Sequence, residues 1–334
     1  MKKLKVAQIG VLHDHADGIF EAVQFFPEQF ELMGYACTDD TKPKSKYYEG
    51  FKEYTVDELL NIPGLDAVFI ECDELHLTEY AMKALQKGLH VHMDKPGGIS
   101  QEAYDEMLAL AKEKKLVFST GYMYRSNPAV QDVIRKIEKG DLGEIYAVEA
   151  HMDCLHTPEK REWLKQFPGG MMFFLGCHLV DLIYRIQGEP EEVIPLNCCV
   201  GSDGVTAEDY GMVVLKYKNG VSFAKTCAAE PGGFTRRQLV ICGTKGTVEL
   251  KPFESYSTLG RPGDMYTDAR HVRMEDCEKY GWNAAGLSSH YGLFRRYDQM
   301  LLDFYDYIIG EKENPYTYEY ESKLHQLVLK TCGL

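Results

Sequence analysis

The sequence lacks any apolar run long enough to cross a membrane. No stretch approaches the roughly 20 apolar residues that a transmembrane helix needs. The basic start MKKLK leads into an apolar run that Gln8 interrupts and that stops at His13. This run is too short for a signal peptide and carries no small-residue cleavage site. We therefore expect a cytoplasmic protein without a membrane partner.

Basic residues are also fewer than acidic ones. The chain carries 37 Lys and Arg residues against 51 Asp and Glu residues, a formal net charge of −14, and no segment gathers the basic residues into a patch. Such a chain repels the phosphate backbone of nucleic acids and anionic membrane surfaces. The composition predicts a small-molecule partner and no nucleic acid.

Cysteine spacings typical of metal or redox motifs are absent. The ten cysteines are scattered, several within apolar segments, and none forms a C-x-x-C pair. This pattern indicates free thiols in a reducing compartment. With 45% hydrophobic and 26% charged residues, the composition is that of an ordinary globular enzyme. The length of 334 residues allows about two domains.

Residues 4–121 alternate short apolar segments with amphipathic ones. We expect strands at 4–9, 30–38, 65–72, 89–94 and 116–121, and helices at 76–88 and 100–115. This alternation is typical of βαβ units in a parallel sheet, whose ligand crevice lies at the carboxyl ends of the strands. We predict that residues 1–121 form a Rossmann-type, doubly wound dinucleotide-binding domain.

The pattern changes after a helix expected at 127–140. Strand-like segments follow at 144–153, 209–228 and 236–250, with a tight hairpin at Asn219-Gly220. Helices at about 293–309 and 319–332 are expected to close this second domain. We predict that residues 122–334 form an α+β domain with an open, mainly antiparallel sheet, which binds substrate and mediates oligomerisation.

The end of the first strand retains only one glycine of a dinucleotide-binding turn. The fingerprint G-x-G-x-x-G places its glycines at Gly10, Leu12 and His15. Leu12 obstructs or shifts the backbone approach to a pyrophosphate, and His15 is much larger than the glycine that allows close helix packing. A cationic His13 or His15 would be one compensation, because it would meet a phosphate directly.

The His13/His15 pair also has a metal interpretation. A His-x-His pair after a first strand begins the metal site of amidohydrolase barrels, which recruit ligands from later strand ends. The candidates here are His76, His90, His92, His151 and His178. An antiparallel sheet after four strand–helix units does not close such a barrel. We predict no metal, with an ion at His13/His15 as the alternative.

Ionisable residues follow the later strands of the first domain. Asp39 would accept hydrogen bonds from ribose hydroxyls and repel a 2′-phosphate, which favours NAD, with NADP as the alternative. Glu71, Asp73 and His76 follow the third strand. Lys95 follows the fourth strand in the turn DKPGG, whose proline and glycines would fix a lysine able to polarise a substrate oxygen. A solvated surface turn is the alternative for the Asp39 and Lys95 segments.

Six segments together resemble the glucose-fructose oxidoreductase/inositol dehydrogenase (Gfo/Idh/MocA) family. MDKPGG is similar to its Glu-Lys-Pro signature, with Asp94 in place of the usual Glu. The others, in the family's order, are ECDELHLTEYAMKAL (71–85), TGYMYRSNPAVQ (120–131), GDLGEIYAVEA (140–150), PGGMMFFLGCHLVDL (168–182) and ICGTKGTVEL (241–250). Each motif alone is weak, but their order along most of the chain identifies the family.

The resemblance implies hydride transfer between nicotinamide and a hydroxyl of a sugar, inositol or glycoside. It makes Lys95 and His178 the catalytic pair: Lys95 would stabilise developing alkoxide charge, and His178 would be the general base. The residues assigned to the cofactor are Gly10, Leu12, His13, Asp39, Glu71, Asp73, His76, Lys95 and Arg125. Those assigned to the substrate are Tyr124, His151, Trp163, Phe174 and Asp181. Members similar to this chain associate through the open sheet face, which implies a homodimer or homotetramer.

Phe174 departs from the family's pattern, in which many members carry an aspartate four residues before the histidine. Residues i and i+4 share one face of an α-helix, so an apolar ring would stand beside His178. This indicates a shorter acid–base relay or an apolar part of the substrate. Two alternatives stay open: a redox-inactive binding or regulatory member with a decayed cofactor loop, and a lyase or hydrolase that uses NAD only transiently.

Overall fold

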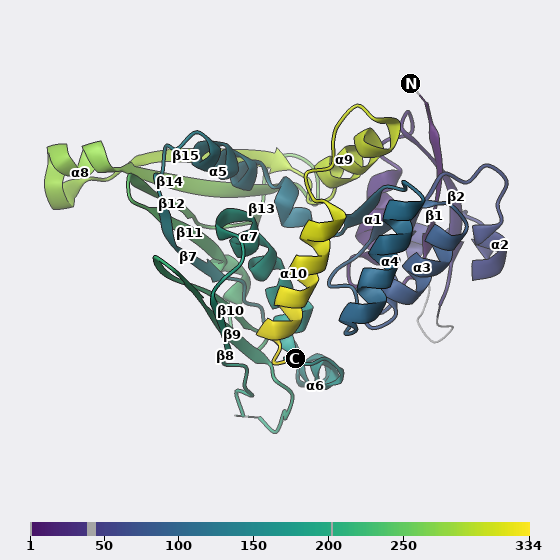
Figure 1. Cartoon of the computed structure of the whole chain (residues 1–334), viewed down its shortest axis with the longest axis horizontal. Coiled ribbons are helices and arrows are strands. Elements are labelled where there is room, and N and C mark those ends of the chain that lie inside the picture. The colour runs from purple at the N-terminus through teal and green to yellow at the C-terminus, as the bar shows by residue number, and fades with distance from the viewer. Residues whose placement is uncertain (1, 39–44, 202) are drawn as a thin grey trace. The chain divides into compact units, whose positions relative to one another are not determined.

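The computed structural model describes residues 2–38, 45–201 and 203–334. The chain divides into two compact units (Figure 1). Unit 1 comprises Met1–Met123 and Tyr297–Gln326, and unit 2 comprises Tyr124–Arg296 and Leu327–Leu334. The assignment of cofactor binding to residues 1–121 and of substrate binding to 122–334 stays a prediction.

Unit 1 is built on a six-stranded parallel sheet with the strand order β3-β2-β1-β4-β5-β6. The strands are β1 (Leu4–Ile9), β2 (Phe30–Ala36), β3 (Glu53–Tyr54), β4 (Ala67–Ile70), β5 (His90–Met93) and β6 (Phe118–Thr120). This is the order of a Rossmann sheet. The predicted doubly wound fold is confirmed.

Helices cover the parallel sheet, so its central strands are largely buried, and β4 is apolar along its whole length. The helices of unit 1 are α1 (Ala16–Val23), α2 (Val56–Leu60), α3 (Leu77–Gln86), α4 (Gln101–Glu113), α9 (Asp298–Ile309) and the larger part of α10 (Tyr318–Thr331), with a 3₁₀ turn at Lys46–Tyr48. Helices α3 and α4 pack side by side with β4 and β5 in one buried core (Figure 1). Both had been predicted from their apolar periodicity.

The C-terminal helix α9 belongs to unit 1, whereas the sequence pattern had placed it in the second domain. Phe304 brings its ring centroid within 5.8 Å of Phe69 and 5.6 Å of His92, and Tyr305 lies 5.7 Å from Phe30. Periodicity identifies an amphipathic helix but not the sheet that it covers. That choice depends on contacts between residues more than 200 positions apart.

Unit 2 contains a nine-stranded sheet with the order β13-β14-β12-β11-β7-β10-β9-β8, and β15 pairs with β14. Its strands are β7 (Ile145–His151), β8 (Glu192–Pro195), β9 (Tyr210–Tyr217), β10 (Gly220–Cys227), β11 (Gln238–Gly243), β12 (Gly246–Leu250), β13 (Ser255–Tyr256), β14 (Met265–Arg273) and β15 (Leu287–Phe294). The pair β7/β10 is parallel and the other pairs are antiparallel. The predicted mainly antiparallel sheet is confirmed.

Unit 2 contains four α-helices among the described residues. They are α5 (Pro128–Glu138), α6 (Pro158–Trp163), α7 (Cys177–Gln187) and α8 (Met274–Tyr280), with 3₁₀ turns at Met123–Ser126, Leu164–Gln166, Gly233–Arg236 and Gly281–Asn283. A π-helical turn, Met172–Gly176, leads directly into α7. The sequence had indicated one regular α-helix there.

Two expectations from composition can be compared with the structure. All ten cysteines are free. Among the residues described, no helix combines the length and the apolar composition that a membrane span requires.

Candidate functional site

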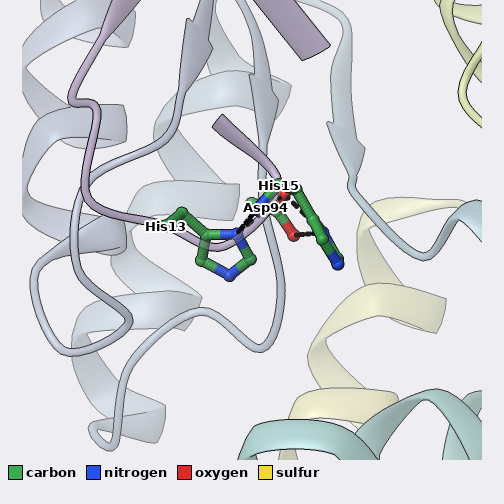
Figure 2. Close-up of side chains that lie close together, drawn as sticks. All are labelled: His13, His15 and Asp94. Atoms are coloured by element: carbon green, nitrogen blue, oxygen red, sulfur yellow. Dashed lines mark hydrogen bonds and ion pairs between the residues drawn. The ribbon is translucent and has the colours of Figure 1, made fainter. Parts of the chain in front are cut away.

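The carboxyl ends of β1 and β5 bring three ionisable side chains together: His13, His15 and Asp94, which we name the His–Asp cluster (Figure 2). His13 Nδ1 lies 3.2 Å from Asp94 Oδ2, and His15 Nδ1 lies 3.0 Å from the same oxygen. The side chains of His13 and Asp94 are fully buried, and that of His15 is 12% exposed. In the parallel sheet β1 and β5 both flank β4, so residues 79 positions apart meet at one edge.

Two further carboxyl groups follow β4 and face His13. Glu71 Oε2 lies 3.9 Å from His13 Nδ1, and Glu74 Oε1 lies 3.8 Å from His13 Nε2. His13 Nε2 and both carboxyl oxygens of Glu71 are buried without a hydrogen-bond partner in the described part of the chain. The cluster is therefore rich in carboxyl groups and contains unsatisfied polar atoms, which are costly in a low-dielectric interior.

Burial and neighbouring charges shift the pKa values of these side chains in different directions. Burial, together with the negative charge of Asp94, raises the pKa of Glu71 well above its ordinary value. Burial also opposes ionisation of Asp94, but the adjacent His13 and His15 hold the pKa of Asp94 well below its ordinary value. Burial lowers the pKa of His15 to about 4. At neutral pH, Asp94 is thus ionised and His15 is neutral, and burial favours the neutral form of Glu71.

The turn after β1 requires glycine at its first position. Gly10 has φ +93°, and a Cβ there would lie 2.3 Å from the backbone nitrogen of Cys72. The next backbone donors are already used, because the N–H groups of Leu12 and His13 both donate to Glu71 O over 3.1 Å. Helix α1 then begins at Ala16 without a side-chain cap from His15.

A dinucleotide therefore fits this unit only in part. The strand order and the tight turn at Gly10 suit it, but the amides of Leu12 and His13 are not free to meet a pyrophosphate. The predicted contact Asp39 lies outside the described residues. Asp73 and His76 form a pair on the surface at the start of α3, with Asp73 Oδ1 2.7 Å from His76 Nδ1.

Lys95 follows β5 and is 1% exposed. Its backbone N–H donates to Asp94 Oδ1 over 2.6 Å, which ties the lysine to the His–Asp cluster. The glycines behind it are tightly held: Gly97 has φ +100°, and a Cβ there would lie 2.4 Å from the ring of Tyr104. The turn thus fixes the backbone from which the buried ammonium group extends.

In unit 2, His178 lies on α7 and is buried, with its ring centroid 5.0 Å from that of Tyr124. Asp181, one turn further along α7, accepts hydrogen bonds from Arg125 Nε and Nη2 over 2.9 and 2.7 Å. Both members of this ion pair are buried. The sequence had assigned Arg125 to the cofactor and Asp181 to the substrate; the structure joins them to each other.

Sequence reasoning missed the partners of Tyr124. Its hydroxyl donates to the buried carboxylate of Glu254 and accepts from Arg237 Nη1 over 3.2 Å. Arg296 Nη2 donates to Glu254 Oε2 over 2.8 Å. No local pattern signals this network, since its members come from segments up to 172 residues apart.

The π-helical turn Met172–Gly176 carries Phe174 and leads into α7, on which His178 lies. The position of Phe174 beside His178 stays a prediction. The ring of Phe174 lies 5.4 Å from Trp163 and 6.3 Å from Phe167. Lys160 Nζ is 3.7 Å from the centroid of the Trp163 ring.

His151 ends β7, partly buried, with its ring centroid 5.4 Å from that of Phe223. Burial lowers the pKa of His151 below its ordinary value. Nearby, Lys225 Nζ lies 3.0 Å from Asp153 Oδ2 and 2.6 Å from Glu230 Oε2. This charge cluster at the strand end is a second feature that sequence reasoning missed.

Comparison with known proteins shows that this chain is similar to oxidoreductases with an NAD-binding Rossmann fold. Residues 14–122 match the model "Oxidoreductase family, NAD-binding Rossmann fold", and residues 130–249 match the GFO/IDH/MocA C-terminal domain. The chain belongs to the Gfo/Idh/MocA family. The first match begins at residue 14, so the turn from Gly10 to His13 lies outside it.

Individual relatives are distant. An uncharacterized oxidoreductase of Schizosaccharomyces pombe is 27% identical over 208 residues, which cover 59% of this chain and 56% of that protein. The 1,5-anhydro-D-fructose reductase of Ensifer adhaerens is 26% identical over 250 residues, 69% of this chain and 75% of that protein. The chain thus spans little more than half of the first relative's length.

The structure of a UDP-N-acetylglucosamine 3-dehydrogenase from Acidithiobacillus ferrooxidans superposes with a TM-score of 0.74 at 18% identity, covering 99% of this chain and 97% of that one. At this identity the likeness is one of fold.

Proposed function

We propose that this protein transfers a hydride between a nicotinamide cofactor and the CH–OH carbon of a small sugar, inositol or glycoside. Membership in an NAD-binding oxidoreductase family and a relative named 1,5-anhydro-D-fructose reductase support this proposal. The single observation that carries it is Lys95, a buried lysine on a constrained turn at the carboxyl end of β5. Burying an ammonium group is costly, so its position indicates a chemical role.

The chemistry assigns separate tasks to the chain's own residues. In the oxidation direction, Lys95 donates a hydrogen bond to the substrate oxygen and stabilises the developing alkoxide, while His178 accepts the hydroxyl proton. Bound nicotinamide would supply the hydride acceptor. In the reduction direction, His178 returns the proton to the oxygen.

The preference for NAD or NADP depends on the residues that would bind the cofactor. We propose that the Gly10 turn, Glu71 and Lys95 lie along the cofactor, and that Asp39 binds the ribose hydroxyls and favours NAD over NADP. For the substrate, the rings of Trp163 and Phe174 support an apolar face of a sugar or polyol.

A redox-inactive binding protein is a second candidate. The observation that favours it is the use of the Leu12 and His13 amides by Glu71 O, which removes donors that a pyrophosphate ordinarily meets. A binding member of the family would take up its ligand without a change in nicotinamide absorbance.

Calorimetric titration with NAD and NADP, followed by a sugar and polyol screen at the nicotinamide absorbance, separates these candidates. Lys95→Met should lower kcat at least about 100-fold with an unchanged melting temperature. Lys218→Met, at an exposed position in the β9–β10 hairpin, is the matched control and should keep full activity. A fully active Lys95→Met enzyme would contradict the assignment, and absence of turnover with every substrate would favour the binding candidate.

We also propose a homodimer or homotetramer formed through the open sheet face of unit 2. One cross-strand row on this face runs Val214, Phe223, Glu149, Val240, and all four side chains are only partly buried. Three of these four side chains are apolar, and a partly covered row of this kind supports association with a second copy.

A further inference from the structure

We propose that His13, His15 and Asp94 bind one divalent transition-metal ion of the zinc type. Imidazole nitrogens and carboxylate oxygens are ordinary ligands of Zn²⁺ and its neighbours, and three protein ligands leave one coordination position open. The proposal goes beyond the hydride chemistry above, which needs no metal.

Two of the three ligand-atom separations already match those of a metal polyhedron. A tetrahedral Zn²⁺ site with bonds of about 2.0–2.2 Å separates neighbouring ligand atoms by roughly 3.3 Å. Asp94 Oδ2 lies 3.2 Å from His13 Nδ1 and 3.0 Å from His15 Nδ1, and the three ligand atoms lie within 4.8 Å of one another. Figure 2 shows both rings turned toward the carboxylate. Small side-chain adjustments therefore suffice to admit an ion.

The hydrogen bonds around His13 leave a contact that a cation would satisfy. The backbone N–H of His15 donates to His13 Nδ1 over 3.2 Å, which requires a lone pair on that nitrogen. The same nitrogen lies 3.2 Å from Asp94 Oδ2, so two acceptor atoms face each other. A proton on Nδ1 would satisfy Asp94 but oppose the N–H of His15. A metal ion between nitrogen and oxygen removes the conflict.

The second ring nitrogen of His13 supports the same arrangement. With Nδ1 as the ligand, Nε2 carries the proton, and Nε2 is buried without a hydrogen-bond partner among the described residues, 3.8 Å from Glu74 Oε1. Histidines that bind metals usually donate their other N–H to a carboxylate or carbonyl. Glu74 is itself buried, so a small approach completes such a contact.

The charges nearby favour a cation over a phosphate at this turn. Asp94, Glu71 and Glu74 supply carboxyl groups from two strand ends, and Lys95 supplies the opposing ammonium. The amides of Leu12 and His13, which would attract an anion, are bonded to Glu71 O. The histidine that replaces the third glycine of the fingerprint is thus a ligand in this arrangement.

The test is metal binding by the full chain after treatment with a chelator. Calorimetric titration with ZnCl₂ should show one ion per chain, and Co²⁺ should give the visible absorption of a site with nitrogen and oxygen ligands. His15→Gln and Asp94→Asn should each weaken Zn²⁺ binding at least about tenfold. His290→Gln is the matched control, because His290 forms a surface pair with Asp268 at 2.6 Å, and it should bind like the unaltered protein.

Absence of stoichiometric Zn²⁺ and Co²⁺ binding by the unaltered protein would overturn the proposal. So would binding that His15→Gln leaves unchanged. Should Asp94→Asn fail to fold, His15→Gln decides the question, because the His15 side chain is partly exposed. The readout is metal binding rather than turnover, so the result is independent of the proposed oxidoreductase activity.

Discussion

At the scale of single residues, Gly10 in the turn after β1 lies so close to the segment after β4 that only glycine fits there. Gly10 has φ +93°, and any side chain there would collide with the backbone of Cys72. Gly88 has a similar φ of +82° but open space around it. Comparing the two glycines distinguishes the free-energy cost of placing a side chain on a left-handed backbone from the added cost of a clash with neighbouring atoms.

Gly10→Ala should therefore destabilise the protein more than Gly88→Ala. A non-glycine residue in the left-handed region costs about 1–2 kcal/mol, and this cost applies to both variants. Only Gly10→Ala adds a clash with backbone atoms, which cannot move aside cheaply. Urea unfolding measures both free energies, and equal losses would contradict the close approach between the β1 turn and β4.

Glu254 is a residue whose ionisation should set part of the acid stability. Burial opposes the charged form, but Arg296 and Arg237 outweigh it and lower the pKa of Glu254 below its ordinary value. A carboxyl group with a lowered folded pKa stabilises the fold above its unfolded pKa of about 4.3, and this contribution is lost as pH falls through the folded pKa.

Glu254→Gln should accordingly unfold more easily at pH 7, by about 3–5 kcal/mol, since it leaves two arginines without their buried partner. The difference from the unaltered protein should shrink as the pH is lowered from about 5 toward 3. Urea unfolding at a series of pH values tests this. A difference that stays constant with pH would show that the ion pair does not carry the effect.

At the scale of elements, the π-helical turn before α7 positions the ring of Phe174 against Trp163 of α6 and Phe167. The ring of Tyr124 packs against His178. π-Helical turns are frequent at functional sites, which agrees with a catalytic role for the histidine that follows.

Phe174→Ala should destabilise the protein by about 3–5 kcal/mol, because a buried ring is replaced by a cavity. It should also shift the fluorescence of Trp163 to longer wavelength, since water gains access to that ring. The other of the two tryptophans, Trp282, is fully exposed and serves as an unchanged background. Phe25→Ala, at a side chain 42% exposed, is the control. An unchanged spectrum would contradict the packing of Phe174 on Trp163.

At the scale of the whole molecule, the chain combines a parallel sheet in unit 1 with a mainly antiparallel sheet in unit 2. Helices cover the parallel sheet of unit 1, as its buried central strands require. In unit 2, alternate residues of β7 and β10 are fully buried, and those between them are only partly covered. The partly covered apolar side chains of that face make a copy of the same chain its proposed partner.

Phe223→Glu should dissociate the proposed oligomer, because it adds a charge to the centre of the partly covered row. Size-exclusion chromatography with light scattering should report a dimer or tetramer for the unaltered protein and a smaller species for the variant. Leu259→Glu, at an exposed position outside the strands, is the control. A monomeric unaltered protein would contradict association through this face.

The sequence by itself determined the class of fold and the family. Apolar periodicity fixed the strands and helices of the βαβ units, because local spacing decides which faces are buried. Motif order then pointed to the family that the comparisons show. Strand ends were recognisable as the places where polar side chains such as Lys95 and Asp94 collect.

Only the tertiary structure decided which of those side chains meet. It placed Asp94 between His13 and His15, joined Arg125 to Asp181, and surrounded Tyr124 with partners from distant segments. It also assigned α9 to unit 1 and formed a π-helical turn before α7. These outcomes depend on packing between residues far apart in the chain, and periodicity carries no information about them.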